Sequence, residues 1–539
     1  MGLVTIVSRN RESPVFGGLD GPVAAAILRT ACEVAFPVTS VIHIIAPPDD
    51  VSQASYPCVI LSNMKRHLLT PALLLLTIPL AAQTPTATAP TSAQPASRPT
   101  PPMAPMTTAE AEAEVVPQMA VKGSPTYAPN LPKRTRRCLI TDSGAAGDGK
   151  TVNTKSIQSA IDKCAANKNG GTVVVPKGIF LSGSIFLKQG VNLLVEKDGV
   201  LKGTTNIDDY PELPELPGGL RGGGTAALVN ADGVTGLTFS GEGTIDGNGE
   251  LWEQNHPRRP AGPAPQNPGL TPPEVGRGRP RLIAIKNAKD VQVARLNLHN
   301  QASWCLWILY SQNVEIDGVK ITAEHNIPSS DGMDIESSKH VHVNHSYLED
   351  NDDCISIKSG KDADGLRVNR PAEDILIENS HFAYGQGGVA MGSEVSGGIR
   401  NVTTLNCLFD DGNWAPIRFK SQPSRGGVME NITYKDIVVH GTRQAFEMNM
   451  EWRMVGPRLP DSNPLPVMRN IKIINVSGDV QSVGNIHGLP GSPIQGVTFE
   501  NCKITADRGF RLDHARSVDL KGLTIKVKQG EPVTTTDVE

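Results

Sequence analysis

The 539-residue sequence has little net charge, few aromatic residues and no cysteine pair at metal-binding spacing. Its formal net charge of −4 is small for this length, which argues against a general nucleic-acid-binding protein, because such a protein would be strongly basic. The eight cysteines form no CxxC pair and have no histidine at zinc-ligand spacing, so neither a structural metal site nor a dense disulfide framework is indicated. We therefore expect no metal and no cofactor, and the cysteine pairing cannot be read from the sequence.

Helical periodicity is also scarce. With 53 glycines, 42 prolines and only 4% aromatic residues, the composition indicates turns and short strands and excludes a helical bundle. The exception is the stretch "TKSIQSAIDKCAAN", in which Ile157, Ala160, Ile161 and Cys164 fall on one face of a helix.

A hydrophobic run long enough to span a bilayer is missing. The apolar run Leu68–Ala82 is shorter than the roughly 20 residues that a spanning helix needs. Together with the basic start at Met64 it predicts a secretory signal peptide over 64–82, and hence a secreted or periplasmic protein without a membrane span. Residues 1–63 are then an upstream segment from a misassigned start codon. Residues 83–130, rich in Pro, Thr and Ala, are predicted to be a disordered linker.

What the sequence does contain is a repeat of short apolar alternations. Examples are "KDVQVARLNL", "QNVEIDGVKI", "KHVHVNHSYL", "EDILIENSHF" and "ENITYKDIVV". Alternation with a period of two predicts strands with one buried face, and openings about 21 to 39 residues apart are typical of a solenoid. We predict that residues 131–530 form an all-β domain, a right-handed parallel β-helix, with the helix near 154–167 as a short N-terminal cap. We expect a monomer.

Acidic residues gather in the stretch "SSDGMDIESSKHVHVNHSYLEDNDDCISIKSG". Asp331 and Asp352 are close to one coil apart, so they should lie on adjacent strands, and a bend after Asp353 would bring this third carboxylate to the same outer groove. Three carboxylates so close cannot all ionise easily, and a protonated acid beside ionised ones suits glycoside hydrolysis. Asp334 we interpret as a turn residue at a strand end.

Cations follow in "APIRFKSQPSRGG", where Arg418 and Lys420 should project together from the outer face. This pair either binds an acidic sugar such as a uronate or merely neutralises the aspartates. Five arginines in a Pro- and Arg-rich loop either extend a basic lip or are solvated, namely Arg258, Arg259, Arg277, Arg279 and Arg281. The glycines of "YGQGGVAMGSEVSGG" either let a sugar chain approach the backbone or pack at tight coil corners.

These motifs together resemble the polygalacturonase family of pectin-degrading glycoside hydrolases, over most of the chain from about Ile140 to residue 450. The Asn-Thr-Asp motif of the family matches "SSD", its Asp-Asp motif matches Asp352 and Asp353, and its Arg-Ile-Lys motif matches "RFK". The resemblance implies an inverting hydrolase of α-galacturonosyl bonds, with Asp352 as the general acid and Asp331 and Asp353 holding the attacking water. Arg418 and Lys420 would bind the substrate carboxylate.

Two positions depart from the family pattern. Gln386 stands where a His is expected, and Trp452 stands at the family's Tyr; both are candidate substrate-binding residues. The resemblance to bacterial members favours exo action on a pectic polysaccharide, and so does the Pro- and Arg-rich insertion over 256–281, which we expect to project as a loop and close one end of the groove. Because relatives acting on rhamnogalacturonan also lack the His, that polymer is a second candidate substrate. A β-helix pectate lyase and a non-catalytic carbohydrate-binding β-helix are two further hypotheses.

Overall fold

The computed structural model describes residues 4–5, 15–16, 128–213, 224–255, 278–453 and 459–539. The predicted signal peptide lies outside these residues, as does nearly all of the predicted linker. Two short strands near the start of the chain pair antiparallel, β1 (Val4–Thr5) and β2 (Val15–Phe16). Among the described residues, no helix is both long and apolar enough to cross a membrane.

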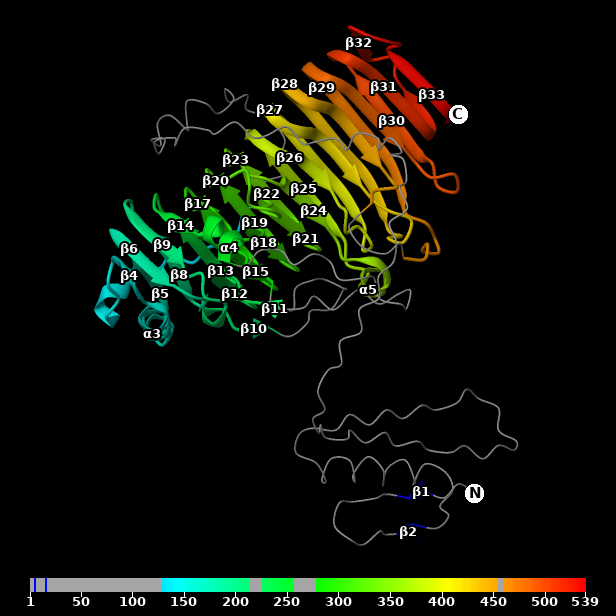
Figure 1. The fold of residues 1–539 in the computed structure, drawn as a ribbon. Coiled ribbons are helices and arrows are strands. Elements are labelled where there is room, and N and C mark those ends of the chain that lie inside the picture. The colour runs from blue at the N-terminus through cyan, green and yellow to red at the C-terminus, as the bar shows by residue number, and fades with distance from the viewer. Residues whose placement is uncertain (1–3, 6–14, 17–127, 214–223, 256–277, 454–458) are drawn as a thin grey trace, which may run out of the picture. The chain divides into compact units, whose positions relative to one another are not determined.

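From residue 128 onward the described chain winds into stacked coils of parallel strands (Figure 1), so the predicted right-handed parallel β-helix is confirmed. In the first half each coil contributes one short strand to each of three sheets. The first sheet, which carries the site described below, contains β7 (Ile185–Phe186), β12 (Val229–Asp232), β15 (Ile283–Lys286), β18 (Leu306–Leu309), β21 (Met333–Glu336) and β24 (Asp353–Lys358).

The other two sheets follow the same succession. The second contains β3 (Arg137–Leu139), β5 (Gly171–Val175), β8 (Val191–Val195), β13 (Thr235–Ser240), β16 (Lys289–Ala294), β19 (Gln312–Asp317), β22 (Lys339–Asn344) and β25 (Ala372–Glu378). The third contains β4 (Asp148–Val152), β6 (Gly178–Ser182), β9 (Gly199–Gly203), β14 (Thr244–Asp246), β17 (Asn297–His299), β20 (Lys320–Thr322) and β23 (Tyr347–Glu349).

In the second half the strands lengthen and run through more than one sheet. They are β26 (His381–Met391), β27 (Ile399–Lys420), β28 (Val428–Asn449), β29 (Val467–His487), β30 (Ile494–Glu500), β31 (Cys502–Asp519), β32 (Leu523–Val527) and β33 (Val533–Val538). A separate antiparallel pair is formed by β10 (Glu212–Leu213) and β11 (Gly224–Thr225).

One corner of the coils is built by polar residues with left-handed backbone. Asn313, Asn401 and Asn431 have φ of 56°, 56° and 58°, a conformation that asparagine tolerates better than most residues. Their side chains hydrogen-bond to the equivalent residue one coil earlier, as in Asn431 Nδ2 to Asn401 Oδ1 at 3.3 Å. These stacked corners explain the many asparagines, and they fix which side chains of the next strand point outward.

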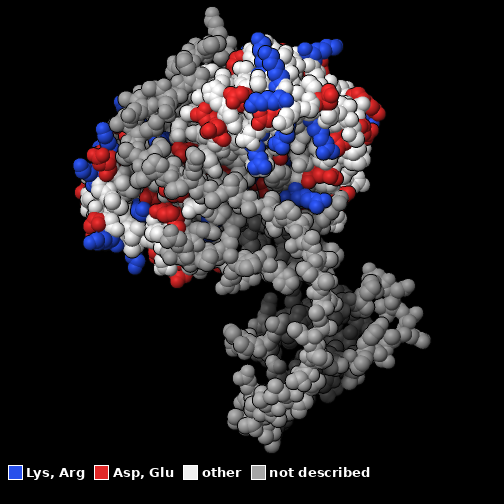
Figure 2. Space-filling view, turned by 45° about the horizontal axis from the view of Figure 1, so that its top comes forward, with Lys and Arg blue, Asp and Glu red and all other residues white. Residues whose placement is uncertain are grey.

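The predicted N-terminal cap is present as α3 (Thr154–Ala165), which buries the four residues that the helical pattern selects. A disulfide that the sequence did not reveal joins Cys164 of this helix to Cys138 of β3, with a Cα–Cα distance of 6.0 Å. The other helical segments among the described residues are η1 (Ile140–Ser143), η2 (Ile207–Asp209), α4 (Gly249–Asn255) and α5 (Asp362–Val368). On the face that Figure 2 shows, acidic and basic side chains are interspersed, in keeping with the small net charge.

Candidate active site

Three carboxylates meet at the start of β24, on the outer face of the first sheet. Met333 of β21 pairs with Ile355 of β24, and this register continues backward to set Asp331 level with Asp353. One oxygen of Asp331, one of Asp352 and one of Asp353 lie within 4.8 Å of one another. The structure therefore brings together the three acids that the sequence selected.

β24 departs from simple alternation of inward and outward side chains next to these three acids. Cys354 and Ile355 are consecutive, yet both belong to the buried apolar core. Asp353 contacts outward-facing cations of a later coil, so the break in alternation falls between Cys354 and Ile355, one residue later than expected. No register shift accompanies it, because Asp353 pairs with Gly387 and Ile355 with Val389 in one unbroken ladder.

Asp353 is neutralised by the two cations of β27. Arg418 Nη1 lies 3.2 Å from Asp353 Oδ1, and Lys420 forms an ion pair with Asp353 Oδ2. Burial of Asp353 would raise its pKa, but the charges of Lys420 and Arg418 outweigh burial, so the pKa of this carboxyl is lowered. Arg418 Nε also donates to Glu447 Oε2 at 2.7 Å, which fixes the guanidinium plane.

The Gly-rich segment makes room for this cluster. A Cβ on Gly387 would collide with Asp353 Oδ1 and lie 3.1 Å from Arg418 Cδ. A Cβ on Gly385 would lie 2.6 Å from Cys354 Sγ. Steric contact around these two residues of β26, and not the tight coil corners suggested by the sequence, is therefore a sufficient reason for glycine at both positions.

Asp331 and Asp352 hold their protons more tightly than free aspartate does. Burial raises the pKa of Asp331, and the charges of Asp334 and Asp352 raise it further. Burial and the charge of Asp353 raise the pKa of Asp352, against a smaller opposing effect of the cations. Asp352, with its raised pKa, and Asp353, with its lowered pKa, therefore differ in proton affinity, so one can donate a proton while the other stays ionised.

Lys358, at the end of β24, is a cation of the site that the sequence analysis missed. Its Nζ lies 2.6 Å from Asp334 Oδ1, 3.5 Å from Asp331 Oδ2 and 3.9 Å from Glu394 Oε2. It also lies 3.7 Å from the ring centroid of Trp304. The interpretation of Asp334 as a turn residue was wrong, since Asp334 lies within β21, is fully buried and pairs with this lysine. Its burial raises its pKa to about 6, with Lys358 opposing.

Gln386 and Trp452 flank the acids and the cations respectively. The backbone N–H of Gln386 donates to the carbonyl of Asp352 at 2.7 Å, while its side-chain Nε2 donates to the carbonyl of Asn351 at 3.3 Å. Trp452 is half-buried, and its ring centroid lies 4.7 Å from Cζ of Arg418 and 5.5 Å from Nζ of Lys420. The aromatic face therefore backs the two cations that pair with Asp353.

Of the five loop arginines, Arg258, Arg259 and Arg277 lie outside the described residues. Arg281 is stacked against the Trp304 and Trp307 rings, with its Cζ 4.5 Å and 4.1 Å from their centroids. Arg279 donates to the carbonyl of Pro328 at 2.7 Å. Both described arginines are therefore engaged with protein groups beside the acids.

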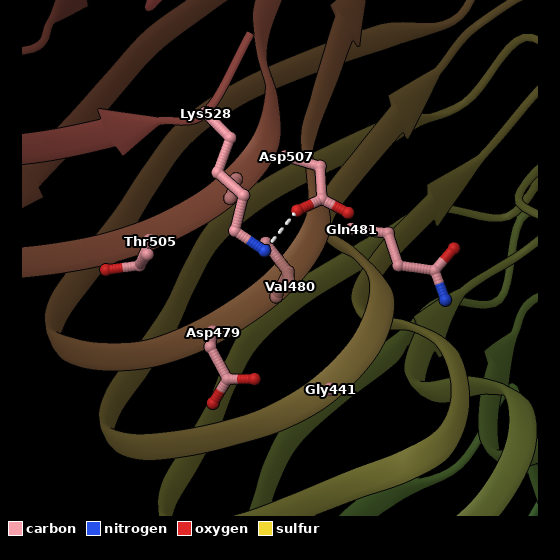
Figure 3. A pocket seen from close by; sticks show the side chains of 8 residues that line it. Gly441, Asp479, Val480, Gln481, Thr505, Asp507 and Lys528 are labelled. Atoms are coloured by element: carbon pink, nitrogen blue, oxygen red, sulfur yellow. Dashed lines mark ion pairs between the residues drawn. The ribbon is translucent and has the colours of Figure 1, made fainter.

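A separate hollow of about 170 Å³ lies on the C-terminal coils (Figure 3). Its lining includes Asp479, Asp507 and Lys528, and Lys528 Nζ lies 2.8 Å from Asp507 Oδ1. The carboxylates there are exposed or paired with this exposed lysine, and no candidate residue from the sequence lines it. The converging buried acids of β21 and β24 are thus the stronger candidate for catalysis.

Comparison with known proteins shows which family the chain is similar to. The family model described as "Glycosyl hydrolases family 28" matches residues 164–522. A "Probable polygalacturonase" of Vitis vinifera is 29% identical over 381 residues, covering 69% of this chain and 74% of the relative. An "Endo-polygalacturonase" of Pectobacterium carotovorum subsp. carotovorum is 25% identical over 386 residues, covering 71% of this chain and 90% of the relative.

The fold is shared with solved structures. A hyperthermoactive exopolygalacturonase from Thermotoga maritima superposes with a TM-score of 0.63 at 24% identity, covering 78% of this chain and 95% of that protein. The family match spans well over half of the sequence and includes all of the converging acids and cations. The chain therefore belongs to glycosyl hydrolases family 28 and is a glycoside hydrolase.

Proposed function

We propose that this enzyme hydrolyses α-galacturonosyl bonds in pectin with inversion. Asp352 is the general acid that protonates the leaving oxygen. Asp331 and Asp353 hold and deprotonate the attacking water. Arg418 and Lys420 bind the substrate carboxylate against Trp452, and Gln386 contacts the sugar.

The unequal environment of the three acids is the observation that carries this proposal. Asp353 has two cations and a lowered pKa, whereas Asp352 lies next to it with a raised pKa. General acid catalysis needs a proton donor whose pKa approaches the working pH, and an activated water needs an ionised neighbour. The shared position of Arg418 and Lys420 over Trp452 suits a planar, anionic sugar group.

Inversion is proposed from the family resemblance. Oxygens of the three acids lie within 4.8 Å of one another, whereas carboxyls of inverting enzymes are usually about 6.5–9.5 Å apart. The stereochemistry therefore needs its own test. Proton NMR of the first-formed anomer from a defined oligogalacturonide should show the inverted configuration, and a retained configuration would make one aspartate a nucleophile.

The decisive test is product analysis on polygalacturonate and rhamnogalacturonan side by side, with EDTA present. Saturated reducing ends from polygalacturonate, lost by about 10³-fold or more in Asp352→Asn, are the expected result. The matched control is Asp317→Asn, an aspartate of β19 that pairs with His345 away from the acids. An Asp352→Asn enzyme as active as this control would overturn the assignment.

Product size and bond type discriminate the competing functions. Monomeric or dimeric products would identify exo action and longer products endo action, and the relatives of this chain include proteins named as each kind. Cleavage of rhamnogalacturonan alone would identify the second candidate, which Gln386 in place of the expected His supports. Unsaturated products abolished by EDTA would identify a lyase, and binding without turnover a carbohydrate-binding protein. Secretion through the signal at 64–82 and a monomeric state also belong to the proposal.

A further inference from the structure

Lys358 is held rigidly inside the acid cluster. Its side chain is 6% exposed, and its Nζ contacts Asp334 at 2.6 Å, Asp331 at 3.5 Å and Glu394 at 3.9 Å. The Trp304 ring covers it at 3.7 Å. A lysine with three anionic contacts and one aromatic face stays charged, and accordingly its pKa is raised well above the usual value because these carboxylates outweigh its burial.

The cations of the site are divided unequally between the acids. Asp353 has both Arg418 and Lys420, whereas the ion pair found for Asp331 among the described residues is the one with Lys358. Asp331 is almost fully buried, with 4% of its surface exposed. Without a cation, a buried carboxyl surrounded by other acids would keep its proton and could not accept one from water.

We propose that Lys358 is a positioning residue for the proposed hydrolysis. Its ammonium group, anchored by Asp334 and Glu394, favours the ionised form of the Asp331 carboxylate and directs it to the attacking water. Asp334 acts as the anchor because its oxygen lies closer to Lys358 Nζ, at 2.6 Å. Asp331, at 3.5 Å, is still within reach of the positive charge of the ammonium group. The inference rests on the proposed function and assigns a role to a residue outside the motifs.

Several other charged groups face Lys358 and Asp331. The acidic ones oppose the effect of Lys358 on the ionisation of Asp331. The charges of Asp334, Asp352 and Asp353 act on Asp331 and favour its protonated form. Glu394 adds negative charge on the lysine side, as does Glu336, register-paired with Lys358 on β21, once it loses its proton near pH 7. The nearby cations are Arg281, which acts on Asp334, and Arg418 and Lys420, which act on Asp353.

The test uses three single variants of the full chain. Lys358→Met should lower kcat on polygalacturonate by about 10²-fold and move the acidic limb of the pH–rate profile upward by at least about one unit. Lys358→Arg should recover part of both. The control is Lys286→Met, which removes a lysine at the same outward register position on β15, equally buried and paired with Asp232 at 3.0 Å. It should leave the profile unchanged.

A double variant separates positioning from mere charge neutralisation. Lys358→Met combined with Asp334→Asn removes both members of the buried ion pair, so the melting temperature should return toward that of the wild type. Activity and the acidic limb should not return, because Asp331 still lacks its cation. Recovery of activity in the double variant would overturn the proposal, as would a Lys358→Met profile no different from that of Lys286→Met. A double variant that does not fold would also overturn it, because the lysine would then serve the fold.

The wild-type enzyme separates this outcome from failure of the proposed function. If the wild type cuts neither pectic polymer, the proposed function fails before any variant is compared. If it cuts polygalacturonate and Asp352→Asn does not, the function holds, and only the Lys358 series decides the role of the lysine.

Discussion

Glu336 offers a quantitative prediction, because it is a buried acid whose charge the fold tolerates poorly. It lies on β21 and is 1% exposed. Its Oε2 accepts a hydrogen bond from Trp307 Nε1 at 2.9 Å. Burial raises the pKa of Glu336 to about 7, although the Trp307 bond and the charge of Lys358 oppose the increase. The perturbation is Glu336→Gln, which removes the ionisation and keeps a carbonyl oxygen for Trp307.

The direction in which stability changes with pH follows from proton binding at Glu336. The ordinary pKa of a glutamate is 4.5, so between pH 4.5 and about 7 the folded protein holds a proton at Glu336 that the unfolded chain releases. This preference stabilises the fold relative to high pH, and it is lost as the pH rises through the folded pKa. A difference of roughly 2.5 units corresponds to about 3 kcal/mol. At pH 8 we therefore expect Glu336→Gln to be more stable than the wild type by up to about 3 kcal/mol, and at pH 4.5 to be nearly equal to it.

Urea unfolding at pH 4.5, 6 and 8 measures this difference as a shift of the denaturation midpoint. The matched control is Glu315→Gln on β19, whose carboxylate also accepts a side-chain hydrogen bond, from Gln292 Nε2 at 2.9 Å, but is partly exposed. We expect no gain at pH 8 from the control. A Glu336→Gln protein that is no more stable than the wild type at pH 8, or whose gain in stability is the same at pH 4.5 and pH 8, would refute this prediction.

Three further predictions address the site and the cap. Trp452→Ala should raise KM for polygalacturonate about 3- to 30-fold, through loss of the cation–π contacts, and Trp452→Phe should raise it less; an unchanged KM would remove Trp452 from the site. Replacing Cys138 and Cys164 with Ala should cost about 3 kcal/mol by opening the covalent loop, seen as faster proteolysis at the N-terminal cap without loss of initial activity. Gln386→Ala should reduce kcat less than about fivefold, because the Gln386 side chain donates to a main-chain carbonyl, and a large loss of kcat would contradict this. Gln386→His should shift the pH–rate profile, because it adds a titrating group.

Much of the fold was predictable because local sequence patterns indicate its strands and its capping helix. Alternation with a period of two marks each strand, and the 3.6-residue periodicity marks α3, independently of what the strands later contact. The cluster of Asp331, Asp352 and Asp353 was predictable because its members are separated by about one coil and match a family motif.

The missed residues depend on the exact register between coils. Met333 pairs with Ile355, but Ile355 pairs with Val389, so successive coils differ in length by many residues. Lys358 and Trp304 meet only when those lengths are known, and nothing in the local sequence distinguishes this lysine from a solvated one. Asp334 was misjudged for a related reason, since a buried charged residue within a strand is improbable until its partner is identified.

The distribution of charge also bears on how the enzyme manages without a histidine at position 386. A histidine near the acids would help to give them different proton affinities, but the coils already provide this difference. Two cations from β27 lower the pKa of Asp353, and the adjacent Asp352, which receives no such direct ion pair among the described residues, has a raised pKa. On the other side Lys358 supports Asp331. In the proposed mechanism the acidic limb of the pH–rate profile then reports Asp331, because the pKa of Asp353 is lowered, and the basic limb reports the loss of the Asp352 proton.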